Sequence, residues 1–103
     1  MKYKKLVRDN IPDIIAKNGE VALTRVLGQK EYIARLIDKL SEEYREFLED
    51  MSFEELADIL EVIYALADEM GGREVLENVR KKKFTERGGF TKRVFLESTG
   101  NGS

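Results

Sequence analysis

The sequence holds no cysteine and no histidine among its 103 residues. The absence of cysteine excludes disulfides and thiol nucleophiles, and the absence of histidine excludes Ser-His-Asp chemistry. Together the two absences exclude the usual zinc sites, whose ligands are mostly cysteine and histidine. Any acid–base chemistry is therefore left to Asp, Glu, Lys or Tyr.

Long apolar runs and an excess of basic residues are missing as well. The first ten residues, MKYKKLVRDN, hold no apolar run of signal-peptide length, and no segment approaches the ~20 apolar residues of a membrane span. We therefore expect a cytoplasmic protein with no membrane partner. The formal net charge is −2, which lacks the basic excess typical of proteins that bind nucleic-acid polymers. An anionic ligand would have to be met by a local group of cations.

The chain also lacks an internal repeat and any linker long enough to separate domains. Its length suits one domain with a single core, much of which stays near the surface. We expect that domain to span residues 1–97, followed by a disordered tail, STGNGS, at residues 98–103.

The spacing of apolar residues predicts a mainly all-α fold. A brief helix should begin at Ile11, with Pro12 in its first turn, and end before Asn18-Gly19. From residue 30 to about residue 50, apolar residues recur at steps of three and four, which indicates a long amphipathic helix.

The next helix should begin with a capping box, in which Ser52 is followed by Glu55 in an S-x-x-E pattern. We expect this helix to run to Met70, where two glycines end it. Because its link to the preceding helix is very short, the two should pack as an antiparallel hairpin. A third long helix is predicted over residues 73–87.

Short accessory β-strands are expected near both ends of the chain. Residues 3–8 are partly β-prone, and residues 21–27 alternate imperfectly between apolar and polar types. Residues 90–97 also have the composition of a strand, which could pair with one of the earlier ones.

The helix predicted at residues 52–70 carries apolar side chains around more of its circumference than one partner helix can cover. A second copy of the chain would cover the remainder. We therefore expect a homodimer or homotetramer in which the hairpins join as a helical bundle.

Two acidic pairs with the same spacing lie on the two hairpin helices. At ~100° per residue, Glu43 and Glu55 fall inside the apolar arcs of their helices. Their partners, Glu46 and Asp58, lie at the edges of those arcs. Carboxylates that face a core are avoided unless they are paired or bind a metal, and oxygen-only ligands favour Mg²⁺ or Mn²⁺. The four acids thus predict a site for hard metal ions and, through them, for a phosphate-bearing ligand.

Two simpler interpretations remain open for these acids. Paired acids three residues apart are common on solvated helices, and Glu55 could serve only as a capping-box residue. Glu42 is close enough to Glu46 to support the metal ligands from outside. Three neighbouring acids lie on the polar arcs and are predicted to be surface charges: Glu49, Glu54 and Glu61.

The pattern EExxE followed by ExxD, here at residues 42–46 and 55–58, resembles that of the MazG-like all-α nucleotide pyrophosphohydrolases. Three longer blocks are similar to the small stand-alone house-cleaning branch of that family: KLVRDNIPDII, EELADILEVIYAL and KKKFTERGGFTKRVFLE. The resemblance covers nearly the whole chain. Only residues 47–54 separate the acidic pairs, a shorter spacer than many relatives have, which bears on substrate range more than on the metal site.

This resemblance implies a MazG-like helical bundle assembled by oligomerisation. It also implies Mg²⁺-dependent hydrolysis of nucleoside triphosphates between the α and β phosphates, which yields a monophosphate and pyrophosphate. Non-standard or damaged nucleotides are the expected substrates. The metal ligands and catalytic residues would be Glu43, Glu46, Glu55 and Asp58.

Basic residues for the remaining phosphate charge occur at the end of the helix at 73–87 and near the start of the chain. The candidates are Lys81, Lys82, Lys83 and Arg87, together with Lys5 and Arg8. Cations in the last turn of a helix also favour its dipole without any ligand. Gly88-Gly89 could let a phosphate approach the backbone or could simply end the helix, and three tyrosines could stack on a base or fill the core: Tyr32, Tyr44 and Tyr64.

Two other functions compete with this hypothesis. One is a related enzyme that acts on phosphoribosyl-ATP in histidine synthesis. The other is a non-catalytic helical dimerisation module that keeps the fold without the turnover.

Overall fold

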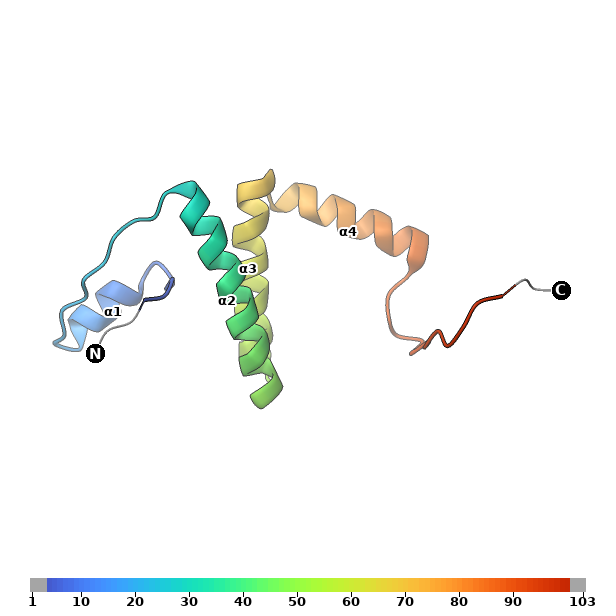
Figure 1. Ribbon diagram of the computed structural model, residues 1–103, viewed down its shortest axis with the longest axis horizontal. Coiled ribbons are helices and arrows are strands. Elements are labelled where there is room, and N and C mark those ends of the chain that lie inside the picture. Colours follow the sequence, from blue (N-terminus) through green and yellow to red (C-terminus); the bar gives the residue numbers. More distant parts are fainter. Residues whose placement is uncertain (1–3, 101–103) are drawn as a thin grey trace.

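Four α-helices and no β-strand occur in residues 4–100, the part of the chain that the computed structural model describes. The helices are α1 (Ile11–Lys17), α2 (Gln29–Glu49), α3 (Phe53–Met70) and α4 (Arg73–Arg87) (Figure 1). None of them combines the length and apolar character that crossing a membrane requires, within those same residues. The predicted all-α class is therefore confirmed.

An antiparallel hairpin of α2 and α3 forms the centre of the molecule (Figure 1). The predicted start of α3 is correct, because the Ser52 hydroxyl accepts a hydrogen bond of 3.2 Å from the backbone N–H of Glu55. Among the residues described, the buried apolar residues all belong to this hairpin: Leu36, Val62 and Ala67. The hairpin thus supplies the core of the single chain and the frame for any site on it.

Helix α4 leaves the top of α3 at a sharp turn and runs away from the hairpin (Figure 1). Gly71 and Gly72 make this turn with φ values of 139° and 118°, which side-chain-bearing residues rarely adopt. Arg73 then donates a hydrogen bond of 3.2 Å from Nη2 back to Asp68. Because α1 lies on the other side of the hairpin, the radius of gyration is 18.9 Å, against about 13 Å for a compact domain of this length.

The predicted accessory strands are wrong for this chain. Residues 4–8, 21–27 and 90–97 form no strand, while residue 3 lies outside the described part. The physical reason is that residues 21–27 and 90–97 lie on opposite sides of the hairpin (Figure 1), so their backbones cannot hydrogen-bond to each other. An extended segment without a neighbouring strand forms no β-sheet. Of the predicted tail, residues 98–100 are irregular and exposed, and residues 101–103 lie outside the described part.

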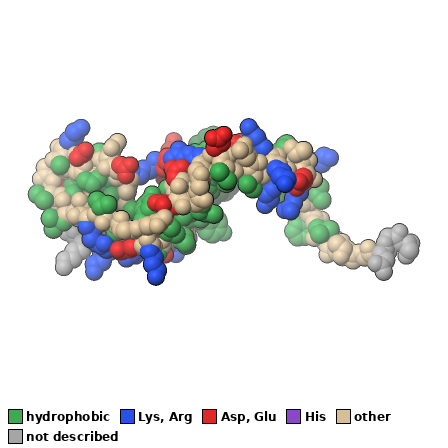
Figure 2. Space-filling view, turned by 90° about the horizontal axis from the view of Figure 1, so that it is seen from above, with side chains coloured by type: hydrophobic (Ala, Val, Ile, Leu, Met, Phe, Trp, Pro, Cys, Tyr) green, Lys and Arg blue, Asp and Glu red, His purple; other side chains and the backbone are tan. Residues whose placement is uncertain are grey.

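Much apolar surface stays exposed on the central hairpin. Hydrophobic side chains gather over the middle of the molecule where the hairpin stands (Figure 2). Large apolar residues on both helices contribute to this surface: Ile37, Tyr44, Leu48, Leu56 and Leu60. Contiguous apolar surface of this kind is typical of an interaction face.

Candidate metal centre

The four predicted acids meet between α2 and α3. Each contributes one carboxylate oxygen to a group whose members all lie within 4.8 Å of one another: Glu43, Glu46, Glu55 and Asp58. The spacing of three residues places both acids of a pair on one helix face, and the antiparallel hairpin turns the two faces toward each other. We call these four residues the acid cluster.

The interior of the acid cluster contains carboxylate oxygens that lack partners. The Glu43 residue is only 5% exposed, and its Oε2 is buried without a hydrogen-bond partner in the described chain. The Oε2 of Glu55 is likewise buried without a hydrogen-bond partner there. A buried oxygen without a partner is strongly disfavoured and in native proteins usually signals an ion or water that satisfies it. The cluster is therefore incomplete as a purely protein structure.

A half-buried lysine contacts the acid cluster from α2. Lys39 Nζ is 3.4 Å from Glu43 Oε1 and 3.4 Å from Glu42 Oε2. All three residues belong to α2, at spacings of three and four that bring side chains together on a helix. This lysine balances only part of the negative charge of the cluster. Sequence reasoning missed Lys39, although its spacing from the two acids was a usable signal.

Burial, together with the crowding of acids, raises the pKa values of two carboxyl groups in the cluster. For Glu43, burial is the largest cause of the raised pKa, and the charge of Glu46 adds to it. For Glu55, desolvation again comes first in raising the pKa, followed by the charges of Glu46 and Asp58. Both groups therefore favour a state in which positive charge, from a proton or a metal ion, enters the cluster.

One predicted phosphate-binding residue, Arg8, reaches the acid cluster. Its Nη2 donates a hydrogen bond of 2.5 Å to Asp58 Oδ1, across 50 positions of sequence. The carbonyl of Arg8 also accepts a 3.1 Å hydrogen bond from the N–H of Ile11, which ties the segment to the start of α1. Lys5 belongs to the same segment, three residues earlier.

The predicted cations on α4 are not brought to the cluster by their own chain. Lys81, Lys82, Lys83 and Arg87 are exposed on α4, which contacts α3 but not α2. Arg87 instead lines a hollow of about 370 Å³ at the turn after α4, together with Gly88, Gly89 and Arg93. Helix boundaries were predictable, but the direction that α4 takes depends on the turn before it.

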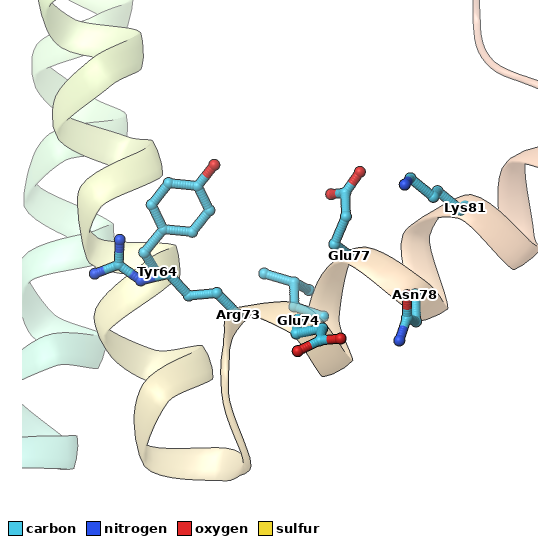
Figure 3. A pocket seen from close by; sticks show the side chains of 7 residues that line it. Tyr64, Arg73, Glu74, Glu77, Asn78 and Lys81 are labelled. Atoms are coloured by element: carbon cyan, nitrogen blue, oxygen red, sulfur yellow. The ribbon is translucent and has the colours of Figure 1, made fainter.

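A second hollow, of about 550 Å³, lies between α3 and α4 (Figure 3). The Arg73 guanidinium lies over the Tyr64 ring there, with its carbon 4.7 Å from the ring centroid. The guanidinium covers one face of the Tyr64 ring, so a nucleotide base cannot stack on that face. Glu74 and Glu77 also line this hollow, and no residue of the acid cluster does. The pocket is thus separate from the candidate metal centre.

Comparison with known proteins adds nothing to this geometry, since no family model, no curated protein and no solved structure matches the chain. The chemistry of the acid cluster and its surroundings therefore carries the functional argument. The resemblance in the acidic motif stays a prediction.

Proposed function

We propose that this protein is a Mg²⁺-dependent nucleotide pyrophosphohydrolase, which hydrolyses nucleoside triphosphates to a monophosphate and pyrophosphate. Non-standard or damaged nucleotides are the proposed substrate class. The observation that carries the proposal is the acid cluster with its two buried, unpartnered oxygens on Glu43 and Glu55. Four convergent carboxylates without histidine or cysteine suit a hard divalent cation.

The four acids would hold the metal with both buried and partly exposed oxygens. Glu43 and Glu55 supply the buried oxygens, and Asp58, whose side chain is 37% exposed, stands at the side open to solvent. When bound, Mg²⁺ would neutralise charge on phosphate oxygens and acidify a water molecule. A carboxylate of the cluster that is not fully engaged would accept the proton of that water. Arg8, beside Asp58, would then contact the phosphate chain.

A homodimer or homotetramer belongs to the same proposal. The exposed apolar side chains of α2 and α3 would be covered when two hairpins join as a bundle of the MazG-like type. Helix α4, which carries the remaining cations at its end, runs away from the hairpin (Figure 1). In an oligomer they are free to serve the cluster of another copy. This would explain why a chain with so many basic residues brings few of them to its own acids.

A pyrophosphate-release assay tests the proposal. The native protein is incubated with Mg²⁺ and a panel of standard nucleotides, oxidised or deaminated nucleotides and phosphoribosyl-ATP. Release of pyrophosphate from the nucleoside triphosphates supports the proposal. Turnover of phosphoribosyl-ATP alone would transfer the assignment to the histidine-synthesis enzyme, and no turnover of any compound would favour the dimerisation module.

A further inference from the structure

We propose that Arg8 is the internal counterion of the acid cluster. Its guanidinium pairs with Asp58 while the cluster is metal-free, and it pairs with a ligand phosphate when metal binds. This inference rests on the proposed function, because it concerns the same metal site. It adds a step that the acids alone do not imply, namely an exchange of partners by one arginine.

The first support is the origin of the contact. Arg8 lies before α1, outside the hairpin, and α1 packs on neither α2 nor α3 within the described chain. The Arg8 side chain nevertheless reaches Asp58, with 2.5 Å between Nη2 and Oδ1. Lys39, by contrast, neutralises Glu43 from within the same helix. Arg8 is thus a cation that a separate segment brings to the cluster, at the partly exposed Asp58.

The second support is the unpartnered interior that remains despite Arg8. The guanidinium binds the outer acid, Asp58, while the Oε2 atoms of Glu43 and Glu55 stay without partners. Glu43 is only 5% exposed, so bulk water does little to compensate its charge. Arg8 therefore compensates the outer charge of the cluster and leaves its centre open for a smaller cation.

The third support is the weakness of the ion pair. The side chains of Arg8 and Asp58 are 54% and 37% exposed. An ion pair at such exposure changes an equilibrium by roughly one- to fivefold. A divalent ion bound by several carboxylates overcomes that competition easily. Once the metal engages Asp58, the guanidinium is released beside the site, and its fork of N–H donors suits a phosphate.

A titration with Mn²⁺, followed by electron paramagnetic resonance of the free ion, tests the first half of the exchange. It compares the native protein with Arg8→Gln and with the control Arg25→Gln, which removes another exposed, ion-paired arginine whose partner, Glu31, is outside the cluster. We expect Arg8→Gln to bind Mn²⁺ about two- to fivefold more tightly, since the competing cation is gone. Arg25→Gln should match the native protein.

Binding of inorganic pyrophosphate at saturating Mg²⁺ tests the second half. Arg8→Gln should bind pyrophosphate about tenfold more weakly, because a charge-assisted contact to phosphate is lost. Unchanged or weaker Mn²⁺ binding by Arg8→Gln overturns the counterion role alone, and unchanged pyrophosphate binding overturns the transfer. If the native protein itself binds no Mn²⁺, the proposed metal site fails, and this inference fails with it.

Discussion

Glu43 on α2 and Glu55 on α3 each bring a carboxylate oxygen to the same small space, and each also keeps a buried Oε2 without a hydrogen-bond partner in residues 4–100. Two helices that only needed to pack would place apolar side chains at these positions, because unpaired buried charge is destabilising. A bound cation would give these two carboxylate oxygens the partner that they lack. The following predictions test that interpretation.

Neutral replacement of the acid cluster should abolish turnover without unfolding the protein. Each change removes one negative charge at nearly constant shape: Glu43→Gln, Glu46→Gln, Glu55→Gln and Asp58→Asn. Repulsion within the cluster falls, so the melting temperature of the metal-free protein should stay or rise. Pyrophosphate release should fall ~100-fold or more, because a missing ligand weakens metal binding or misplaces the reacting water.

Glu49→Gln and Glu61→Gln are the matched controls for this series. Both make the same charge change on the same two helices, but at exposed positions outside the cluster. Pyrophosphate release should stay within a few fold of native, the scale of a surface perturbation. Equal losses in both sets would show that the acids are a solvated surface and that the site lies elsewhere.

Divalent metal should stabilise the native protein against heat. Binding to the folded state alone adds RT ln(1 + [L]/Kd), which is about 2.7 kcal/mol when the metal is at a hundred times its Kd. Differential scanning fluorimetry in a chelator and then in millimolar Mg²⁺ or Mn²⁺ measures the shift. The shift should vanish in Glu55→Gln and persist in Glu49→Gln. A melting temperature that neither metal changes would argue against a metal site in the acid cluster.

Local sequence signals predicted the helices and the acid cluster well. The S-x-x-E pattern located the start of α3, because the Ser52 hydroxyl and the Glu55 N–H are neighbours whatever the rest of the chain does. Predicted and observed starts of α2 differ by one residue, 30 against 29. The convergence of Glu43 with Glu55 followed from helical spacing and one short link. Such features need no knowledge of distant contacts.

Features that depend on distant parts of the chain were not predictable. Residues 21–27 and 90–97 have the composition of strands, but a strand needs a partner, and the two segments lie far apart. The direction of α4 is decided by the backbone at Gly71 and Gly72, which spacing does not reveal. The pairing of Arg8 with Asp58 likewise crosses 50 positions without any periodic signal.

The protein should be a homo-oligomer at micromolar concentration. Its single chain buries few apolar side chains and has a radius of gyration of 18.9 Å, well above that of a compact domain of this size. Covering Leu48 on α2 and Leu60 on α3, both exposed, would supply the missing core. Light scattering should give a multiple of the 11.9 kDa chain mass, and Leu60→Glu should shift it toward one chain. A native protein that stays monomeric across this range would contradict the prediction.

The metal-free protein should become more stable as the pH falls from neutral, and metal should reverse that trend. Because burial raises the native pKa values of Glu43 and Glu55, the folded state binds protons that the unfolded chain does not. The unfolding free energy therefore rises as the pH drops through these raised values, and the gain is complete near the ordinary carboxyl pKa of roughly 4.3. Below that value the trend reverses, because Glu31 and Glu77, whose pKa values are lowered by hydrogen bonds from arginines, lose their stabilising charge.

Thermal melts in a chelator between pH 7.5 and 5 measure this dependence. The double variant Glu43→Gln, Glu55→Gln should show a flatter curve than the native protein, because it lacks the two carboxyl groups whose pKa values burial raises. In saturating Mg²⁺ the native protein should instead lose stability as the pH falls, since protons then compete with the metal for the same oxygens. Parallel curves for the native and double-variant proteins in chelator would mean that neither carboxyl group is desolvated in solution, and the buried cluster itself would have to be abandoned.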